Sequence, residues 1–85
     1  MADLGDIVTS KTRIKLLELF LSDISEKYHI RGVVRETKEE VNSVRRELEH
    51  LAGTGVFKKE SRGNRVYYWV NPDYQFFEDL ISLVA

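Results

Sequence analysis

The sequence contains no cysteine and only one proline among its 85 residues. Without cysteine, the chain can form neither disulfides nor thiolate metal sites, so a reducing cytoplasm is the expected location. Long hydrophobic runs are also missing, because the most apolar stretch, residues 14–24, is too short and too polar to span a bilayer. Residues 1–9 lack the basic segment of a signal peptide, and we expect a flexible lead-in there, followed by one domain at 10–85.

Charge is distributed unevenly along the chain, although the formal net charge is only −1. Residues 31–65 contain nine Lys/Arg and six Asp/Glu, whereas the two flanking stretches together contain four Lys/Arg and eight Asp/Glu. The small total argues against a generic polyanion binder. A DNA-binding protein, however, needs a positive face rather than a positive sum, and the central stretch could supply one. Ordinary scatter of charge along the chain is the alternative explanation.

Apolar spacing predicts three helices in the first half of the chain. The first is capped at Thr9 or Ser10 and runs to about residue 23, and its apolar side chains form two neighbouring stripes: Ile14, Leu17, Leu21 and Ile24, then Leu16, Leu19 and Phe20. An extended piece at 28–30 precedes a short helix at 31–36 with Val33 and Val34 pointing inward. Thr37 and Glu40 match a capping box for a third helix that ends near residue 53. Its apolar stripe comprises Val41, Val44, Leu48 and Leu51.

Two strands and a last helix are predicted in the second half. The strands, 56–61 and 66–71, pair through a two-residue turn at Gly63 and Asn64. This register places Arg62 opposite Arg65 and Lys58 opposite Trp69, where we expect a cation–π contact. One face of the hairpin then carries Phe57, Val66, Tyr68 and Val70. Asn71 and Pro72 suit the cap and first position of a helix that runs to the chain end.

The exposed face of the helix at about 40–53 provides candidate DNA-binding residues: Asn42, Ser43, Arg45 and Arg46. Arginine can grip guanine and asparagine can grip adenine through paired hydrogen bonds. The alternative is a solvated face on which both arginines pair with Glu49. Glu39 and Glu40 argue against DNA binding, because they would face phosphates.

The hairpin provides a second basic element. Arg62 and Arg65 bracket its turn, where they can lie along a sugar–phosphate backbone or enter a minor groove. Alternatively, the turn is solubilising and its charges block strand-to-strand aggregation.

The terminal helices have more apolar surface than one small core needs. In the last helix, one stripe consists of Tyr74, Phe77, Ile81 and Val84, and the other of Phe76, Leu80 and Leu83. We expect a homodimer interface built from the leftover stripes, Leu16, Leu19, Phe20, Phe76, Leu80 and Leu83. The alternatives are a core that uses both stripes and a missing downstream partner domain.

Catalysis has little support in this sequence. His29 and His50 lie far apart, and neither a Gly-rich phosphate loop nor a Ser/His/Asp spacing stands out. We therefore expect no enzyme activity, no cofactor and no metal.

Together these segments resemble winged helix-turn-helix domains of the ArsR-like type. Residues 10–17 are similar to the family's opening helix, 44–51 to its recognition helix, 55–58 to its first wing strand, and 63–68 to its wing tip and second strand. The resemblance extends over about residues 9–84. It is strongest to a bacterial and archaeal subgroup found as stand-alone regulators or just upstream of a small nucleotidyltransferase domain.

The resemblance implies an α+β fold, mainly α, with a three-helix core, a two-stranded wing and a C-terminal helix. It implies a transcriptional regulator that binds double-stranded DNA as a homodimer, with helix 40–53 in the major groove and wing 58–66 on the backbone. By position, the groove-facing residues are Asn42, Ser43, Arg45 and Arg46, and the wing contacts are Arg62, Asn64 and Arg65.

This sequence departs from the family pattern in three ways. Metal-sensing members bind metal through cysteines, so metal sensing is not implied here. Lys38 stands where glycine is common, and Thr37 replaces the usual leucine. The alternative functions are a protein-interaction module with the same fold and a recognition domain cut from a larger nucleotidyltransferase-type protein.

Overall fold

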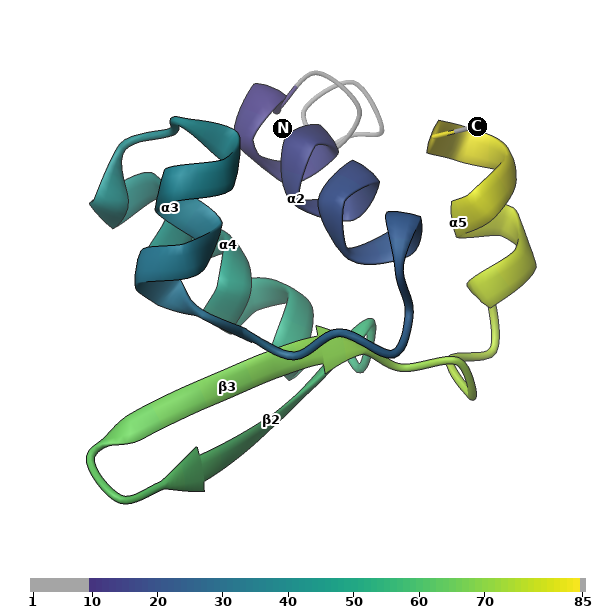
Figure 1. Ribbon diagram of the computed structural model, residues 1–85. Helices are drawn as coiled ribbons and strands as arrows, with labels where there is room; N and C mark the ends of the chain where they lie inside the picture. Colours follow the sequence, from purple (N-terminus) through teal and green to yellow (C-terminus); the bar gives the residue numbers. More distant parts are fainter. Residues whose placement is uncertain (1–9, 85) are drawn as a thin grey trace.

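The computed structural model describes residues 10–84, so the expected lead-in at 1–9 lies outside the described residues. In chain order, the elements are α2 (Lys11–Ser22), β1 (Tyr28–His29), α3 (Ile30–Thr37), α4 (Val41–Gly53), β2 (Phe57–Arg62), β3 (Arg65–Val70) and α5 (Phe77–Val84). The strands form an antiparallel sheet in the order β1-β3-β2. Figure 1 shows the β2–β3 hairpin extending away from the helices. In the same view, α2 lies between α5 on one side and α3 and α4 on the other. This is a winged helix-turn-helix fold, as the sequence predicted.

The core lies where α2, α3 and α4 meet the base of the hairpin. Its buried side chains come from α2 (Leu16, Leu17, Phe20), α3 (Val33), α4 (Val44, Leu48, Leu51), the segment before β2 (Val56) and the sheet (Phe57, Tyr68, Val70). Phe20 and Phe57 stack with their ring centroids 4.2 Å apart. The predicted inner face of the hairpin is therefore confirmed, and burial of this apolar surface supplies the main stabilising term.

Two parts of the predicted apolar pattern are wrong. Val41 was expected in the buried stripe of α4, but it sits at the first position of the helix and is 41% exposed. Leu16 and Phe20 were expected in a dimer interface, but both are fully buried. Because α2 packs against α3, α4, α5 and β3, the protomer's own core uses both of its stripes.

The turn between α3 and α4 differs from the predicted capping box. The Thr37 hydroxyl donates back to the carbonyl oxygen of Val33, so Thr37 ends α3 rather than capping α4. Lys38 adopts the left-handed conformation, with φ of 58°. The cap of α4 is Glu40, whose carboxylate accepts from the backbone N–H groups of Asn42 and Ser43. The predicted start of this helix was correct, but its cap was assigned three residues too early.

The hairpin has the predicted register, with Arg62 opposite Arg65 and Lys58 opposite Trp69. Gly63 occupies the turn with φ of 63°, a conformation that costs glycine little. The expected contact of Lys58 with Trp69 is wrong, because the Lys27 ammonium lies 4.4 Å from the indole centroid instead.

The last helix begins at Phe77, not at Pro72 as predicted. Asn71 ties the preceding turn to the body, because its side chain donates to the carbonyl oxygen of Gly55 and accepts from the N–H of Asp73. No side chain of α5 is fully buried, and the large apolar residues Phe76, Ile81 and Leu83 are 49%, 42% and 50% exposed. None of the helices within residues 10–84 has the length and apolar character needed to cross a membrane.

Candidate nucleic-acid interface

The first two turns of α4 bring together four of the predicted site residues. Asn42, Arg45 and Arg46 are exposed and Ser43 is partly buried. Arg45 donates to the side-chain oxygen of Asn42 at 3.0 Å, and Arg46 lies 3.4 Å from the Ser43 hydroxyl. These are neutral hydrogen-bond partners, so both guanidinium groups keep their full charge toward solvent.

The alternative explanation of this face required Arg45 and Arg46 to pair with Glu49. Glu49 pairs with neither of them. Its carboxylate accepts from the Lys59 ammonium at 2.9 Å and from the Tyr68 hydroxyl. Hydrogen bonds from Tyr68 and Lys59 hold the pKa of Glu49 below its usual range, and burial raises the pKa of Tyr68. Glu49 therefore joins α4 to both strands of the wing and fixes their relative positions.

Glu39 and Glu40, which argued against DNA binding, are both engaged by the protein. Glu39 accepts from the Lys15 ammonium and the Thr12 hydroxyl, each at 2.8 Å. The hydrogen bond from Lys15, followed by that from Thr12, lowers the pKa of Glu39. Glu40 is held at the N-terminus of α4, where its charge complements the helix dipole. Neither carboxylate is therefore an isolated negative charge at the start of α4.

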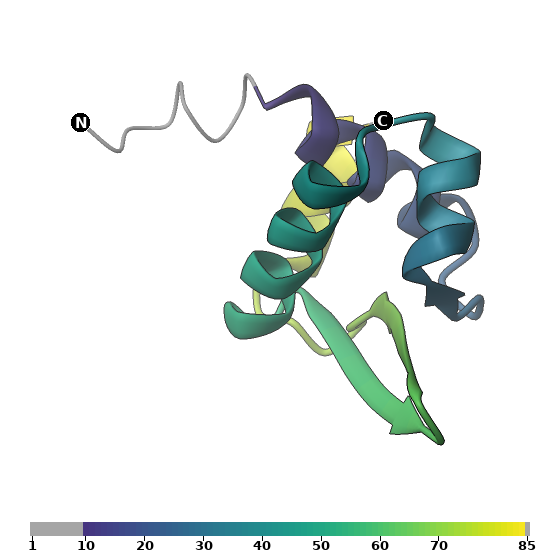
Figure 2. The same cartoon turned by 90° about the vertical axis from the view of Figure 1, so that its left-hand side faces the viewer.

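The wing residues Arg62, Asn64 and Arg65 are all exposed at the tip of the hairpin. Figure 2 shows this tip projecting beyond α3 and α4. Arg62 lies 3.6 Å from the Glu60 carboxylate, a pair so exposed that it contributes little energy. Arg65 has no acidic partner among residues 10–84.

Only part of the predicted site faces the same space. Arg45 and Asn64 line one hollow of about 280 Å³ between α4 and the wing, together with Glu49, Tyr68 and His29. Arg62 and Arg65 lie on the other face of the hairpin, because they alternate with Ser61 and Val66, whose face also carries Tyr68. Arg45 of the helix and Asn64 of the wing tip thus share a hollow, whereas Arg62 and Arg65 lie on the opposite face of the hairpin.

Within residues 31–65, most acidic side chains have a partner in the protein, whereas most basic side chains have no acidic partner among the described residues. Five of the six glutamates accept hydrogen bonds or ion pairs from within the protein: Glu39, Glu40, Glu47, Glu49 and Glu60. Of the nine Lys/Arg, only Lys59 and Arg62 have an acidic partner among the described residues. The other seven are Arg31, Arg35, Lys38, Arg45, Arg46, Lys58 and Arg65. The central stretch is therefore more cationic at its surface than its sequence balance indicates.

Three residues near the wing were missed by the sequence reasoning: His29, Arg31 and Arg35. Pairing of β1 with β3 brings His29 opposite Tyr67, and all three residues line one hollow with Arg65. The sequence predicted an extended piece at 28–30 but not its pairing partner. The available signal was the spacing of Arg31 and Arg35, which puts both on one face of a short helix.

No family model matches the sequence, and the curated proteins gave no match. Among solved structures, the chain resembles that of Rv0081 from M. tuberculosis, with a TM-score of 0.68 and 20% sequence identity. The alignment covers 92% of this chain and 74% of the Rv0081 chain. At this identity the likeness supports the fold, and the argument for function depends on the residues described above.

Proposed function

We propose that this protein is a DNA-binding transcriptional regulator of the ArsR-like kind, working as a cytoplasmic homodimer. The observation that supports this most directly is the N-terminal half of α4, where Arg45 and Arg46 are exposed without an acidic partner among the described residues. In this proposal α4 enters the major groove, and Arg46 and Asn42 contact base edges.

The wing would bind the backbone beside that groove. Asn64 lies across a shared hollow from Arg45, so a phosphate strand seated there would contact both elements. Arg62 and Arg65, on the other face of the tip, would contact the flanking backbone or minor groove. The Glu49 contacts to Lys59 and Tyr68 would hold the two elements at the spacing that the duplex requires.

The homodimer would form through the exposed face of the C-terminal region. Phe76, Ile81 and Leu83 are about half exposed, and Leu80 lines an apolar hollow of about 220 Å³ with Leu17 and Leu51. Large exposed apolar patches are typical of interaction sites, and these side chains would supply one. A two-fold axis here would present two α4 helices to one duplex. The α2 side chains that were expected in the interface are part of the core, so α5 would form the interface without them.

Fluorescence anisotropy with duplex DNA at two salt concentrations tests the proposal. Arg46→Ala should weaken binding to a selected duplex by about 1–3 kcal/mol, or roughly 5- to 150-fold. Lys11→Ala is the matched control, because it removes an exposed cation outside α4 and the wing. Equal binding by the parent and Arg46→Ala would refute the site assignment.

The same experiment separates the rival function, a protein-interaction module that uses the exposed α5 face. Electrostatic DNA binding weakens steeply as the salt concentration rises, because the protein releases counterions from the DNA when it binds and this release is less favourable in high salt. No binding to any duplex at low salt would therefore favour the interaction module.

A further inference from the structure

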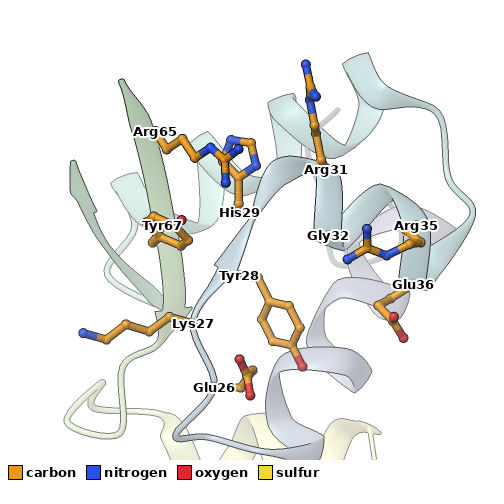
Figure 3. A pocket seen from close by; sticks show the side chains of 10 residues that line it. All are labelled: Glu26, Lys27, Tyr28, His29, Arg31, Gly32, Arg35, Glu36, Arg65 and Tyr67. Atoms are coloured by element: carbon orange, nitrogen blue, oxygen red, sulfur yellow. The ribbon is translucent and has the colours of Figure 1, made fainter. Parts of the chain in front are cut away.

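A hollow of about 390 Å³ lies on the face of the hairpin that points away from α4. It is bounded by β1, the first turns of α3 and strand β3, and Figure 3 shows the side chains around it. His29 lines this hollow and also the one beside α4, so it stands between the two. The proposed function assigns only Arg65 in this hollow, and leaves the rest of its lining unexplained.

The charged side chains are separated along this hollow. Figure 3 places Arg65, His29 and Arg31 at one end and Glu26 and Glu36 toward the other. Neither arginine at the basic end forms an ion pair within residues 10–84. The basic end therefore has two guanidinium groups and an imidazole without a counter-charge.

Lys27 and Arg35 also line this hollow but belong less to its basic end. The Lys27 ammonium contacts the Trp69 ring at 4.4 Å and lies 3.9 Å from Glu60. Figure 3 shows Arg35 beside Gly32 and Glu36, away from Arg65. Arg35 also lacks an acidic partner among the described residues, but the unpaired positive charges at the basic end of the hollow are those of Arg31 and Arg65.

The electrostatics of His29 report this concentration of charge. Burial, then the charges of Arg65 and Arg31, lower the pKa of His29 from its usual value. The carboxylate that faces it from α4, Glu49, is occupied by Lys59 and Tyr68, and Arg45 adds another cation across the shared hollow. His29 also stands at the N-cap of α3, where its side chain makes no capping hydrogen bond.

We propose that Arg31, Arg65 and His29 form a binding site for a phosphate group. The two guanidinium groups would neutralise the anion, and the imidazole would take up a proton and donate a hydrogen bond to it. The rings of Tyr67 and His29, with centroids 5.9 Å apart, would form the wall on which a base or sugar attached to that phosphate could rest.

The phosphate can come from the DNA backbone or from a free phosphorylated small molecule. The first source depends on the proposed function, because it extends the DNA contact around the wing to α3. The second source does not depend on it, since a small anion would occupy the site whether or not α4 binds DNA.

The first experiment follows both histidines of the intact protein by NMR. Sulfate serves as the probe, because it is a tetrahedral anion that stays doubly charged across the titration range of histidine. Compared with chloride at the same ionic strength, sulfate should raise the pKa of His29 by about one unit, the size expected for a nearby opposite charge. His50 is the internal control, because it lies on α4 and does not line the hollow, so sulfate should not affect its signals.

Two variants test the assignment of the site. Arg31→Ala should at least halve the sulfate-induced change at His29, and without sulfate it should raise the pKa of His29 by removing a repulsive charge. Arg31 is exposed, so the substitution should not disturb folding. Lys58→Ala is the matched control, because this wing lysine is exposed and does not line the hollow.

Adding a duplex distinguishes the two sources. If the backbone occupies the site, DNA should prevent the sulfate effect at His29, and Arg31→Ala should reduce the salt slope of DNA binding by about one. If the ligand is a free phosphate compound, sulfate should still act on His29 in the DNA complex and the salt slope should be unchanged.

The proposal is overturned if neither sulfate nor DNA changes His29 more than His50, or if Arg31→Ala leaves the sulfate effect intact. Loss of DNA binding in Arg46→Ala with an unresponsive His29 would keep the proposed function and refute this site. If His29 responds to sulfate but the protein binds no duplex, the phosphate site is kept and the proposed function is refuted.

Discussion

The hydrogen bond between Glu49 and Tyr68 allows a quantitative test of how α4 is fixed to the wing. The Tyr68 side chain is nearly buried, at 6% exposure, whereas the Glu49 side chain is 51% exposed. A hydrogen bond to a charged group contributes about 1.5–3 kcal/mol, and the solvent at Glu49 places this one at or below the low end. The ion pair of Glu49 with Lys59 adds less than about 0.5 kcal/mol, because both side chains are half exposed.

A double-mutant cycle with Glu49→Ala and Tyr68→Phe isolates this interaction. We expect a coupling free energy of about 1–1.5 kcal/mol at neutral pH. Glu49→Ala should lower the thermal midpoint by about 5–10 °C, since 1 kcal/mol corresponds to about 4–8 °C in a domain of this size. Thermal and urea unfolding followed by circular dichroism measure both quantities. Glu60→Ala is the matched control, because it removes a glutamate from the same wing that has only exposed ion pairs, and it should change stability by less than about 0.5 kcal/mol.

The contribution of Glu49 to stability should depend on pH in a defined direction. Hydrogen bonds from Tyr68 and Lys59 lower the folded-state pKa of Glu49 below the ordinary value of a glutamate, so the charged carboxylate stabilises the folded protein at pH values above that ordinary value. This stabilisation should disappear as pH falls through the folded-state pKa, because both states then bind the proton. A coupling below about 0.3 kcal/mol at pH 7, or one that persists fully after Glu49 is protonated, would contradict the reasoning.

Two further predictions concern the inter-helix turn and the oligomeric state. Lys38→Gly should stabilise the protein by about 0.5–1 kcal/mol in urea unfolding. Glycine removes the cost of about 1–2 kcal/mol that a left-handed backbone imposes on lysine, but it also increases the conformational entropy of the unfolded chain, which offsets part of the gain. Unchanged or lower stability would mean that the lysine side chain contributes something at this position. Phe76→Ser with Leu83→Ser should convert a dimer into monomers in sedimentation experiments at tens of micromolar, with the secondary structure intact. A parent protein that is itself strictly monomeric at that concentration would refute the dimer.

Local sequence signals predicted most of the fold, because they act within one element. The stripe of Val44, Leu48 and Leu51 required only helical periodicity. The hairpin register required only a turn at Gly63 and Asn64 between alternating residues, and the structure confirms it. The two helix caps that were misassigned, and the late start of α5, depended on competition between hydrogen-bond partners.

At both misplaced caps, the predicted residue accepts from the N–H two residues on, but its side chain also bonds to another partner and the helix begins later. Thr37 suits a cap, but its hydroxyl bonds within its own helix, and Glu40 takes the capping position. Asn71 suits a cap too, yet its amide reaches Gly55, which lies 16 residues earlier in the chain. Sequence patterns identify residues that can cap a helix, but tertiary contacts decide whether they do.

The candidate site was predictable where it lies on one element and not where strands bring elements together. The exposed residues of α4 followed from one helical wheel. The environment of Arg65 did not, because it depends on β1 pairing with β3 and on where that pairing puts Arg31. Likewise, nothing local indicated that α2 would use both stripes, since that depends on how many neighbours pack around it.

The same dependence on topology explains how a chain with a net charge of −1 can carry a cationic surface. Glu39 and Glu47 belong to the central stretch, but their partners Lys15 and Arg13 come from α2. Basic residues from an acidic flank thus pair with acidic residues on or next to α4, while Arg45 and Arg46 remain without acidic partners among the described residues. The potential that a polyanion meets is set by these pairings and not by the sum of charges. A sequence balance of charge therefore underestimates how strongly this face can attract nucleic acid.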